Sequence, residues 1–376
     1  MTSSTTSAKT AATKIFDVIV IGGGQAGLAV GYYLRRAKVD FIILDNQERS
    51  GGAWQHFWPS LQLFSPAWMS SLPGRMMPKS KESMTPHRDE VLYYFADYEQ
   101  HYKLPIYRPY KVQSVERDED NDCLRVSDDR YTWLAKAVVS ATGAWSNEYI
   151  PDMAGRQDYL GDQHHSAYYK GPESYQDKRV LVVGGGNSGA QIFAELVPVA
   201  DASWVTRKPP KFLPDDVDGR ALFERATARI RGNKNIDNSN NAAPVEGNIV
   251  MMPAIKKVRD KGLLKTRPMF TRLTEHGVVW PDGCEEQIDA IIWCTGFEPE
   301  LKHLAPLGVI EKDGTIRNEQ GQAIKEPRLW VFGYGNWASP ASATIIGAGR
   351  SARENMPALL EFLRAETKDE VKKATL

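Results

Sequence analysis

The sequence predicts an α/β fold made of two Rossmann-like dinucleotide-binding domains, the second inserted into the first. Three observations support this prediction. A strand, a glycine turn, a helix and a strand follow one another over residues 16–45, and the same order recurs over residues 179–207. Strand and helix patterns then return over residues 290–296 and 329–364. Since sheet and helix flank the second copy on both sides, we expect two segments to connect the domains.

The first copy has the features of a dinucleotide-binding turn. Residues 18–21 form a β-branched run suited to a buried parallel strand. Gly22, Gly24 and Gly27 give G-x-G-x-x-G, which allows a tight turn, close approach of a pyrophosphate and close packing of the helix. The helix N-terminus directs free N–H groups at the phosphates. Asp45 ends the next strand, where a carboxylate accepts ribose hydroxyls.

The second copy differs from the first at the end of its second strand. Its glycine spacing recurs over residues 184–189, but Arg207 and Lys208 stand where the first copy has Asp45. A carboxylate repels a 2′-phosphate, whereas arginine and lysine attract it. The first site therefore suits FAD or NAD, and the second favours NADPH over NADH. The alternative is that Arg207 and Lys208 are ordinary surface charges.

Composition and cysteine use limit the classes of function. The 376 residues carry 47 Lys+Arg and 47 Asp+Glu, so no basic field indicates nucleic-acid binding. No apolar run approaches the roughly 20 residues that a membrane helix needs. Residues 1–14 are Ser/Thr-rich without an apolar segment, which favours a disordered tail over a secretory signal. Three dispersed cysteines without C-x-x-C fit a reduced cytoplasmic protein and argue against a dithiol-disulfide flavoenzyme.

Three further stretches are candidates for cofactor contact. Residues 51–74 combine paired glycines with many aromatic side chains, which indicates either an aromatic core under a long loop or the wall of a flat aromatic cofactor. The small-residue strand ends at 141–143 and 294–296 allow backbone to approach a cofactor. A helix that opens near Thr344 directs its positive end at a ligand; for a flavin, negative charge gathers there on reduction.

The segment 209–270 has an irregular pattern. Residues 215–219, with three aspartates, are interpreted as caps and turns, because no histidine or cysteine stands at ligand spacing; no metal site is predicted. A helix is expected near 221–231, and the polar run 233–241 is expected to be a mobile surface loop.

Together these residues resemble the class B flavin-dependent monooxygenases, and more closely the small bacterial flavin-containing monooxygenases, some of them associated with arsenic-resistance clusters. The resemblance covers about residues 16–360. The family pattern F-x-G-x-x-x-H-S-x-x-Y-[KR] is matched, with tyrosine for the leading phenylalanine, by Tyr159, Gly161, His165, Ser166, Tyr169 and Lys170. Tyr169 replaces the Trp-Pro ending typical of the Baeyer–Villiger subgroup, so the chain is similar to the heteroatom-oxidising side.

The resemblance implies FAD at the first glycine motif and NADPH at the second, with acceptance of NADH left open. The implied FAD-binding residues are Gly22, Gly24, Gln25, Ala26, Gly27, Asp45, Asn46, Gln47, Gly52, Ala53, Trp54, Leu61, Phe64, Val112, Ala141, Thr142, Gly143, Trp145, Asn336 and Thr344. The implied NADPH-binding residues are His165, Ser166, Tyr169, Gly184, Gly186, Asn187, Ser188, Gly189, Arg207, Lys208, Cys294, Thr295 and Gly296. The alternative role of His165, Ser166 and Tyr169 is packing of the linker.

We expect a disordered tail over residues 1–14 and a FAD-binding domain over 15–170 plus 285–376. An inserted NADPH-binding domain is expected over 171–284, with the irregular segment inside it.

Two positions depart from the family pattern. Many flavin-containing monooxygenases carry a Thr-Asn pair whose asparagine steadies the peroxyflavin. Aligned on Ser60 and Leu61, this sequence has Leu63 and Phe64 there, so Phe64 is expected to form an apolar, flavin-facing wall instead. Asn336 replaces an aspartate that serves the ribityl chain, and it hydrogen-bonds a hydroxyl without charge assistance.

The implied activity is an FAD- and NADPH-dependent monooxygenation. NADPH reduces FAD, dioxygen adds at flavin C4a, and the hydroperoxide transfers one oxygen to a soft nucleophile such as a sulfide or amine, while the other oxygen leaves as water. The cofactors carry the chemistry, so no catalytic side chain is named. Two alternatives stay open: a flavin-dependent NADPH oxidase or diaphorase, and a non-catalytic flavin-binding redox sensor. The expected partners are a small-molecule substrate and dioxygen, without nucleic acid or membrane, in a cytoplasmic protein that forms the default homodimer.

Overall fold

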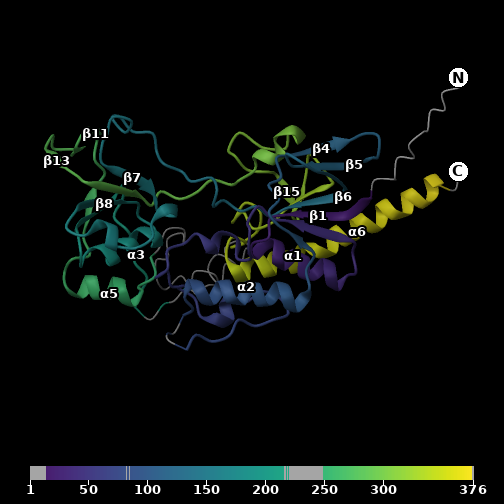
Figure 1. The fold of residues 1–376 in the computed structure, drawn as a ribbon, viewed down its shortest axis with the longest axis horizontal. Coiled ribbons are helices and arrows are strands. Elements are labelled where there is room, and N and C mark those ends of the chain that lie inside the picture. Colours follow the sequence, from purple (N-terminus) through teal and green to yellow (C-terminus); the bar gives the residue numbers. More distant parts are fainter. Residues whose placement is uncertain are drawn as a thin grey trace, which may run out of the picture.

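The computed structural model describes residues 14–374 except 82, 84, 216, 218 and 220–248. The helix expected near 221–231, the polar run 233–241 and nearly all of the expected tail lie outside the described residues. The described chain folds into two α/β lobes (Figure 1). The larger lobe holds both ends of the described chain, and the smaller lobe is formed by the middle of the sequence.

The larger lobe is built on a nine-stranded sheet. Its main path runs in the order β15-β16-β17-β6-β1-β2-β3, with β4 and β5 paired beside β6. The strands are β1 (Ile15–Ile21), β2 (Phe41–Leu44), β3 (Ile106–Tyr107), β4 (Ser114–Asp118), β5 (Cys123–Ser127), β6 (Thr132–Ser140), β15 (Asn318–Glu319), β16 (Gln322–Ala323) and β17 (Leu329–Val331). The helices are α1 (Gln25–Arg36), α2 (Arg88–Tyr102) and α6 (Ile345–Ala374).

The β-branched run of β1 is buried on both faces, as a central parallel strand requires. Val18 and Val20 pack into a core with α1, α2 and α6, whereas Ile19 and Ile21 pack on the opposite face with β4, β5 and the short helix η5 (Lys302–Leu307). Strands β2 and β6 pair in parallel with β1 on its two sides. The carboxyl ends of these strands therefore meet at one edge of the sheet.

The smaller lobe contains a five-stranded parallel sheet in the order β10-β9-β8-β14-β7 and a separate three-stranded antiparallel sheet, β11-β12-β13. Its strands are β7 (Asp162–His165), β8 (Arg179–Val183), β9 (Asp201–Thr206), β10 (Thr266–Pro268), β11 (Arg272–Thr274), β12 (Gly277–Val279), β13 (Glu285–Gln287) and β14 (Ala290–Trp293). Its helices are α3 (Asn187–Leu196) and α5 (Pro253–Asp260).

The sheet membership changes the expected domain boundaries. Strands β7 and β14 pair with each other, and β14 pairs with β8, all within the smaller lobe. The expected boundaries at 170/171 and 284/285 would divide this sheet. We therefore propose that the inserted domain runs from about residue 150 to about residue 297. Glu148 and Phe297, in the two segments that connect the lobes, form an antiparallel bridge.

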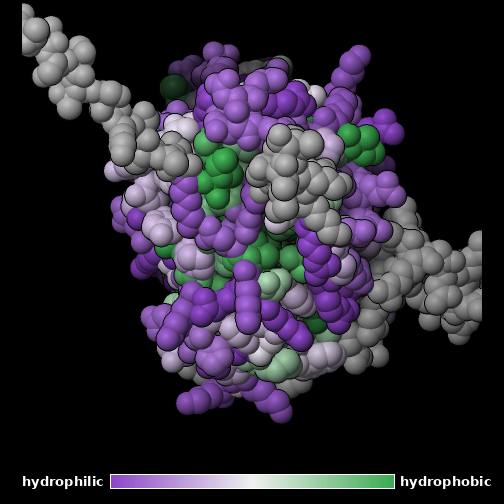
Figure 2. Space-filling view, turned by 90° about the vertical axis from the view of Figure 1, so that its right-hand side faces the viewer, coloured by the Kyte–Doolittle hydropathy of each residue, from purple (hydrophilic) through white to green (hydrophobic). Residues whose placement is uncertain are grey.

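The outer face of the larger lobe is mainly hydrophilic. Figure 2 shows this side, and its hydrophobic residues appear in small separate areas between hydrophilic ones. In the part of the chain that the structure describes, we find no helix with both the length and the apolar composition of a membrane span. The described residues also contain no group of three or more His, Cys, Asp or Glu side chains placed to hold a metal ion.

Candidate functional site

The first glycine turn connects β1 to α1 at the carboxyl edge of the larger sheet. Gly22 has φ +107°, and a Cβ atom there would lie 2.5 Å from the carbonyl oxygen of Ala141. A Cβ atom on Gly27 would overlap the carbonyl of Gly22, so the helix can pack this closely only with glycine. The backbones of Gly24 and Gly52 also approach each other, because a Cβ atom on Gly52 would lie 2.7 Å from Cα of Gly24.

The N-terminus of α1 is open to a ligand. Gly24 caps the helix without a side chain, and the first turn carries no acidic residue. Its free N–H groups and the helix dipole therefore favour an anion there. The side chain of Gln25 accepts a hydrogen bond from Trp54 Nε1 (3.1 Å) and donates one to the carbonyl of Ala343 (2.6 Å). The glycine turn, the aromatic loop and the start of α6 thus converge.

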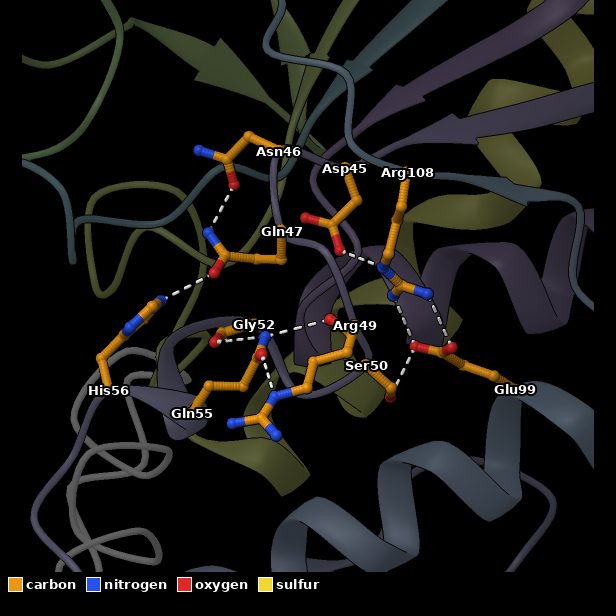
Figure 3. Close-up of polar contacts among 10 residues, drawn as sticks. All are labelled: Asp45, Asn46, Gln47, Arg49, Ser50, Gly52, Gln55, His56, Glu99 and Arg108. Carbon is orange, nitrogen blue, oxygen red and sulfur yellow. Dashed lines mark hydrogen bonds and ion pairs between the residues drawn. The ribbon is translucent and has the colours of Figure 1, made fainter.

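Asp45 lies at the end of β2, but its carboxylate is already paired. Its Oδ2 accepts a hydrogen bond from Nε of Arg108 at 2.6 Å, and Arg108 also donates to both carboxylate oxygens of Glu99 (Figure 3). Burial opposes the charge of Arg108, but its bonds to Glu99 and Asp45 outweigh this effect and raise its pKa. Sequence patterns did not indicate Arg108. Among the described residues, Oδ1 of Asp45 has no hydrogen-bond partner and remains for a ligand.

A second chain of polar contacts begins at Asn46, next to Asp45, and leads to the aromatic loop. Gln47 donates to Oδ1 of Asn46 (2.6 Å), and His56 Nε2 lies 2.7 Å from Oε1 of Gln47 (Figure 3). The His56 ring stacks on Trp145 with centroids 5.9 Å apart. Burial, followed by the charges of Lys170 and Arg49, lowers the pKa of His56. Asn46, Gln47 and Trp145 are thus joined through His56.

Tyr334 holds the end of β6 and was not anticipated. Its hydroxyl lies 2.5 Å from Ser140 Oγ and 2.6 Å from Thr142 Oγ1, and it accepts the Thr142 N–H at 3.2 Å. His303 Nε2 extends the network to Ser140 Oγ at 3.0 Å, and burial lowers the pKa of His303 to about 4. This buried network fixes the backbone of residues 141–143, where we expected cofactor contact.

The remaining residues implied for the first site are placed by local packing. The side-chain oxygen of Asn336 accepts the N–H of Ala341. Thr344 Oγ1 donates to the carbonyl of Ala341 and accepts the N–H of Gly347 in the first turn of α6. Val112 is partly buried against the core that contains β4 and β5. Ala53 and Trp54 lie in the short helix η1 (Gly52–Gln55).

The second glycine turn repeats the first at the carboxyl edge of the smaller sheet. A Cβ atom on Gly184 would overlap the carbonyl of Cys294, and one on Gly189 would overlap the carbonyl of Gly184. Gly186 caps α3 without a side chain, which leaves that helix N-terminus open as well. Trp204, unanticipated, donates its indole N–H to the Gly184 carbonyl at 2.7 Å and stabilises the turn.

Arg207 and Lys208 follow β9 directly, and both side chains are exposed. Over the part of the chain that the structure describes, neither forms an ion pair. Two cations are therefore available at the position equivalent to Asp45. Asn187, in contrast, is engaged by protein, since its side-chain oxygen accepts the N–H of Val250 at 2.9 Å.

The family motif lies where the connecting segment enters the smaller lobe. His165 is fully buried, its Nδ1 accepts the Ala167 N–H (3.2 Å), and its ring contacts Phe297 edge-on at 4.6 Å. Burial lowers the pKa of His165, and the charge of Glu148 and a backbone hydrogen bond with Gly296 partly offset this effect. Ser166 hydrogen-bonds the Cys294 thiol, whose pKa burial raises to about 12. Cys294 is therefore a neutral thiol at this site.

The aromatic loop, residues 52–72, packs against the smaller lobe. Trp58 and Leu61 are buried in the core of that lobe, and Phe64 is partly buried against it. The carbonyl of Phe64 accepts the N–H of Gly219 at 2.7 Å. Part of this loop is therefore packed as an aromatic core, which was one of the two interpretations of its sequence. A flavin-facing role for Phe64 stays a prediction.

The expected acidic patch has a structural role where it is described. Asp215 forms a two-contact ion pair with Arg259, and its carbonyl accepts the Lys256 ammonium at 2.8 Å. The adjacent Asp216 and Asp218 lie outside the described residues.

Comparison with known proteins identifies the family. Residues 19–218 match the family described as pyridine nucleotide-disulphide oxidoreductase. The chain belongs to this family. The flavin-containing monooxygenase from Stenotrophomonas maltophilia is 44% identical, with 93% of this chain and 99% of that chain covered and a TM-score of 0.84. An uncharacterized CzcO-like oxidoreductase from Geobacillus kaustophilus is 31% identical over 90% of this chain and 96% of its own length.

These similarities confirm the expected resemblance to the class B flavin monooxygenases and the fold of two Rossmann-like domains. A cyclohexanone monooxygenase with 17% identity and a TM-score of 0.70 supports the same fold. The protein is an oxidoreductase enzyme of the flavin-containing monooxygenase kind.

The family description includes disulphide chemistry, for which flavoenzymes use a pair of cysteines. The three cysteines of this chain, Cys123, Cys284 and Cys294, are all free and far apart in the sequence. A dithiol mechanism needs two cysteines close together.

Proposed function

We propose that the protein is an FAD- and NADPH-dependent monooxygenase that transfers one oxygen atom of dioxygen to a soft nucleophile such as a sulfide or amine. The observation that carries this proposal is the difference between two otherwise equivalent sites. One glycine turn is followed by a paired carboxylate, Asp45, and the other by the exposed cations Arg207 and Lys208, which form no ion pair with any residue that the structure describes. One site therefore suits an adenosine ribose, and the other a ribose 2′-phosphate.

The residues of the first site fit FAD. The Gly24 and Gly52 backbones leave a cradle that a Cβ atom would fill, next to the open N-terminus of α1. That arrangement suits a pyrophosphate. Oδ1 of Asp45 is available for a ribose hydroxyl, and Asn336 and Thr344 stand at the start of α6 for the distal part of the cofactor. These assignments are part of the proposal.

The residues of the second site fit NADPH. Gly186 and the open N-terminus of α3 suit the pyrophosphate, while Arg207 and Lys208 suit the 2′-phosphate. His165, Ser166 and the segment 294–296 lie at the lobe connection, where the nicotinamide would approach the flavin. NADH is expected to be a weaker donor than NADPH.

The chain contributes placement and exclusion of water. When bound, flavin accepts a hydride and activates dioxygen. Trp54, Phe57 and Phe64 are partly buried against the core of the smaller lobe, and they would shield the flavin from water. Burial raises the pKa of the Cys294 thiol to about 12, so we do not assign it as a nucleophile.

A second candidate function is an NADPH oxidase or diaphorase without oxygen transfer to an organic substrate. Phe64 favours it, since an apolar side chain replaces the amide common in flavin-containing monooxygenases. A non-catalytic redox sensor is the third candidate, and it would leave the second site without a purpose.

One experiment distinguishes the three functions. Purified FAD-loaded protein is mixed with NADPH and oxygen, with and without a simple thioether, and NADPH loss, peroxide and sulfoxide are all quantified. Sulfoxide in proportion to NADPH consumed supports the monooxygenase. NADPH loss matched by peroxide alone supports the oxidase, and bound FAD without NADPH loss supports the sensor.

We further propose a cytoplasmic homodimer. Three free cysteines suit a reducing compartment, and closed dimers are the commonest assembly of soluble enzymes. Light scattering of the purified protein tests the dimer, because a monomer mass at micromolar concentration would contradict it.

A further inference from the structure

The carboxylate of Glu195 joins three separate segments of the chain. Glu195 lies on α3 of the smaller lobe. Its Oε1 accepts hydrogen bonds from Trp58 Nε1 (3.0 Å) and Ser60 Oγ (2.7 Å), and its Oε2 accepts one from the Tyr169 hydroxyl (3.0 Å). Trp58 and Ser60 belong to the aromatic loop, and Tyr169 follows β7 within the smaller lobe.

Three hydrogen-bond donors converge on this one carboxyl group. A carboxylate only accepts hydrogen bonds, and all three donors are neutral. Trp58 and Tyr169 are buried, so without Glu195 their polar hydrogens would lose their partner away from water. Among the described residues, Glu195 makes no ion pair with a lysine or arginine. Within the described residues, Glu195 therefore accepts hydrogen bonds from neutral side chains and does not pair with a positive charge.

Contacts next to Glu195 also connect the aromatic loop to the smaller lobe. The Trp58 and Tyr169 rings meet edge-on with centroids 5.8 Å apart, and the Lys170 ammonium donates to the carbonyl of His56 at 3.0 Å. The same loop reaches the first glycine turn at its other end, through the Trp54 indole and Gln25. A continuous path of contacts therefore leads from α3 to the start of α1.

We propose that Glu195 is a positioning residue that fixes the aromatic loop of the larger lobe against α3 of the smaller lobe. Through this loop it sets how the two nucleotide sites face each other. Its effect on hydride transfer rests on the proposed function, whereas its effect on the loop does not.

Glu195→Gln tests the proposal. The amide keeps the size of the side chain but places an NH₂ group where at least one donor points. Glu275→Gln is the matched control, because Glu275 is an exposed carboxylate of the same lobe whose near contact is a weak one with His276. Hydrogen exchange of peptides covering residues 52–72 and 165–175 is measured in each protein, together with FAD content and the kinetics of flavin reduction by NADPH.

We expect Glu195→Gln to raise exchange in these two peptides by roughly tenfold, with peptides of β1 and α1 unchanged. Flavin reduction should slow by a similar factor at saturating NADPH, while FAD content stays that of the native protein. Glu275→Gln should match the native protein in every measurement.

Unchanged exchange in Glu195→Gln would overturn the proposal, whatever the turnover. Faster exchange with native flavin reduction would also overturn it, because the loop would then not set the geometry of the two sites. If the native protein does not oxidise NADPH at all, the proposed function fails, and the exchange comparison still decides whether Glu195 fixes the loop.

Discussion

Arg108 donates a hydrogen bond of 2.6 Å from Nε to Oδ2 of Asp45, and the two residues are 63 positions apart in the chain. The same guanidinium bonds both oxygens of Glu99 on α2, and Ser50 adds a donor to Glu99 at 2.8 Å. All three charged side chains are at least 85% buried. Asp45 is thus held in place by an arginine that no motif of the first nucleotide site contains.

Removing this arginine is expected to destabilise the protein strongly. Arg108→Met leaves two buried carboxylates without their cation, and such losses cost about 3–5 kcal/mol in free energy of unfolding. Lys178→Met is the control, because its partner Asp162 and Lys178 itself are well exposed, and such a pair contributes below about 1 kcal/mol. Urea unfolding measures both. Equal small losses would show that the Arg108 network is not a stabilising unit.

The cradle at the first glycine turn is expected to require Gly52. Gly52 has φ +51°, and a Cβ atom there would meet Cα of Gly24 at 2.7 Å. We expect Gly52→Ala to weaken FAD binding by roughly tenfold or more, equivalent to about 1.4 kcal/mol. Gly262→Ala shares the positive φ but has open space around its Cβ position, so it should cost stability without changing FAD affinity. Fluorescence titration of apoprotein with FAD compares them.

Arg207 is expected to select the phosphorylated dinucleotide. A charge-assisted contact with phosphate is worth about 1.5–3 kcal/mol, so Arg207→Ala should raise the KM for NADPH roughly tenfold or more and leave the KM for NADH nearly unchanged. Arg272→Ala, an exposed arginine on β11 of the same lobe, serves as the control. A parallel rise of both KM values would remove Arg207 from this role.

His303 is expected to make the protein less stable in acid. Burial lowers its pKa to about 4 in the folded state, against 6.5 for the free side chain, so the unfolded chain binds the extra proton first as pH falls. Stability should decline from about pH 6.5 down to about pH 4, by up to about 3 kcal/mol from this group.

The variant His303→Leu isolates this contribution. It should flatten the dependence of unfolding free energy on pH between about 4 and 6.5, measured in urea at several pH values. His276→Leu removes an exposed histidine and should keep the native dependence. A His303→Leu profile that is parallel to the native one would contradict the prediction.

Local sequence patterns were sufficient to predict the two strand–turn–helix units. The β-branched strands, the glycine spacing and the following helices lie within one short stretch, so β1 with α1 and β8 with α3 follow from sequence alone. The pairing of β7 (Asp162–His165) with β14 did not follow, because β7 is short and polar.

The sequence by itself determined the two glycine turns and the charges that follow them, because glycine, aspartate and arginine act there through their own size and charge. Asp45 and Arg207 were therefore found at the ends of corresponding strands. Only the tertiary structure decided which partners hold these groups. Arg108 reaches Asp45 because β3 pairs with β2, and Glu195 meets Trp58 because the aromatic loop packs across the two lobes. Such contacts depend on distances between remote segments, which no local pattern encodes.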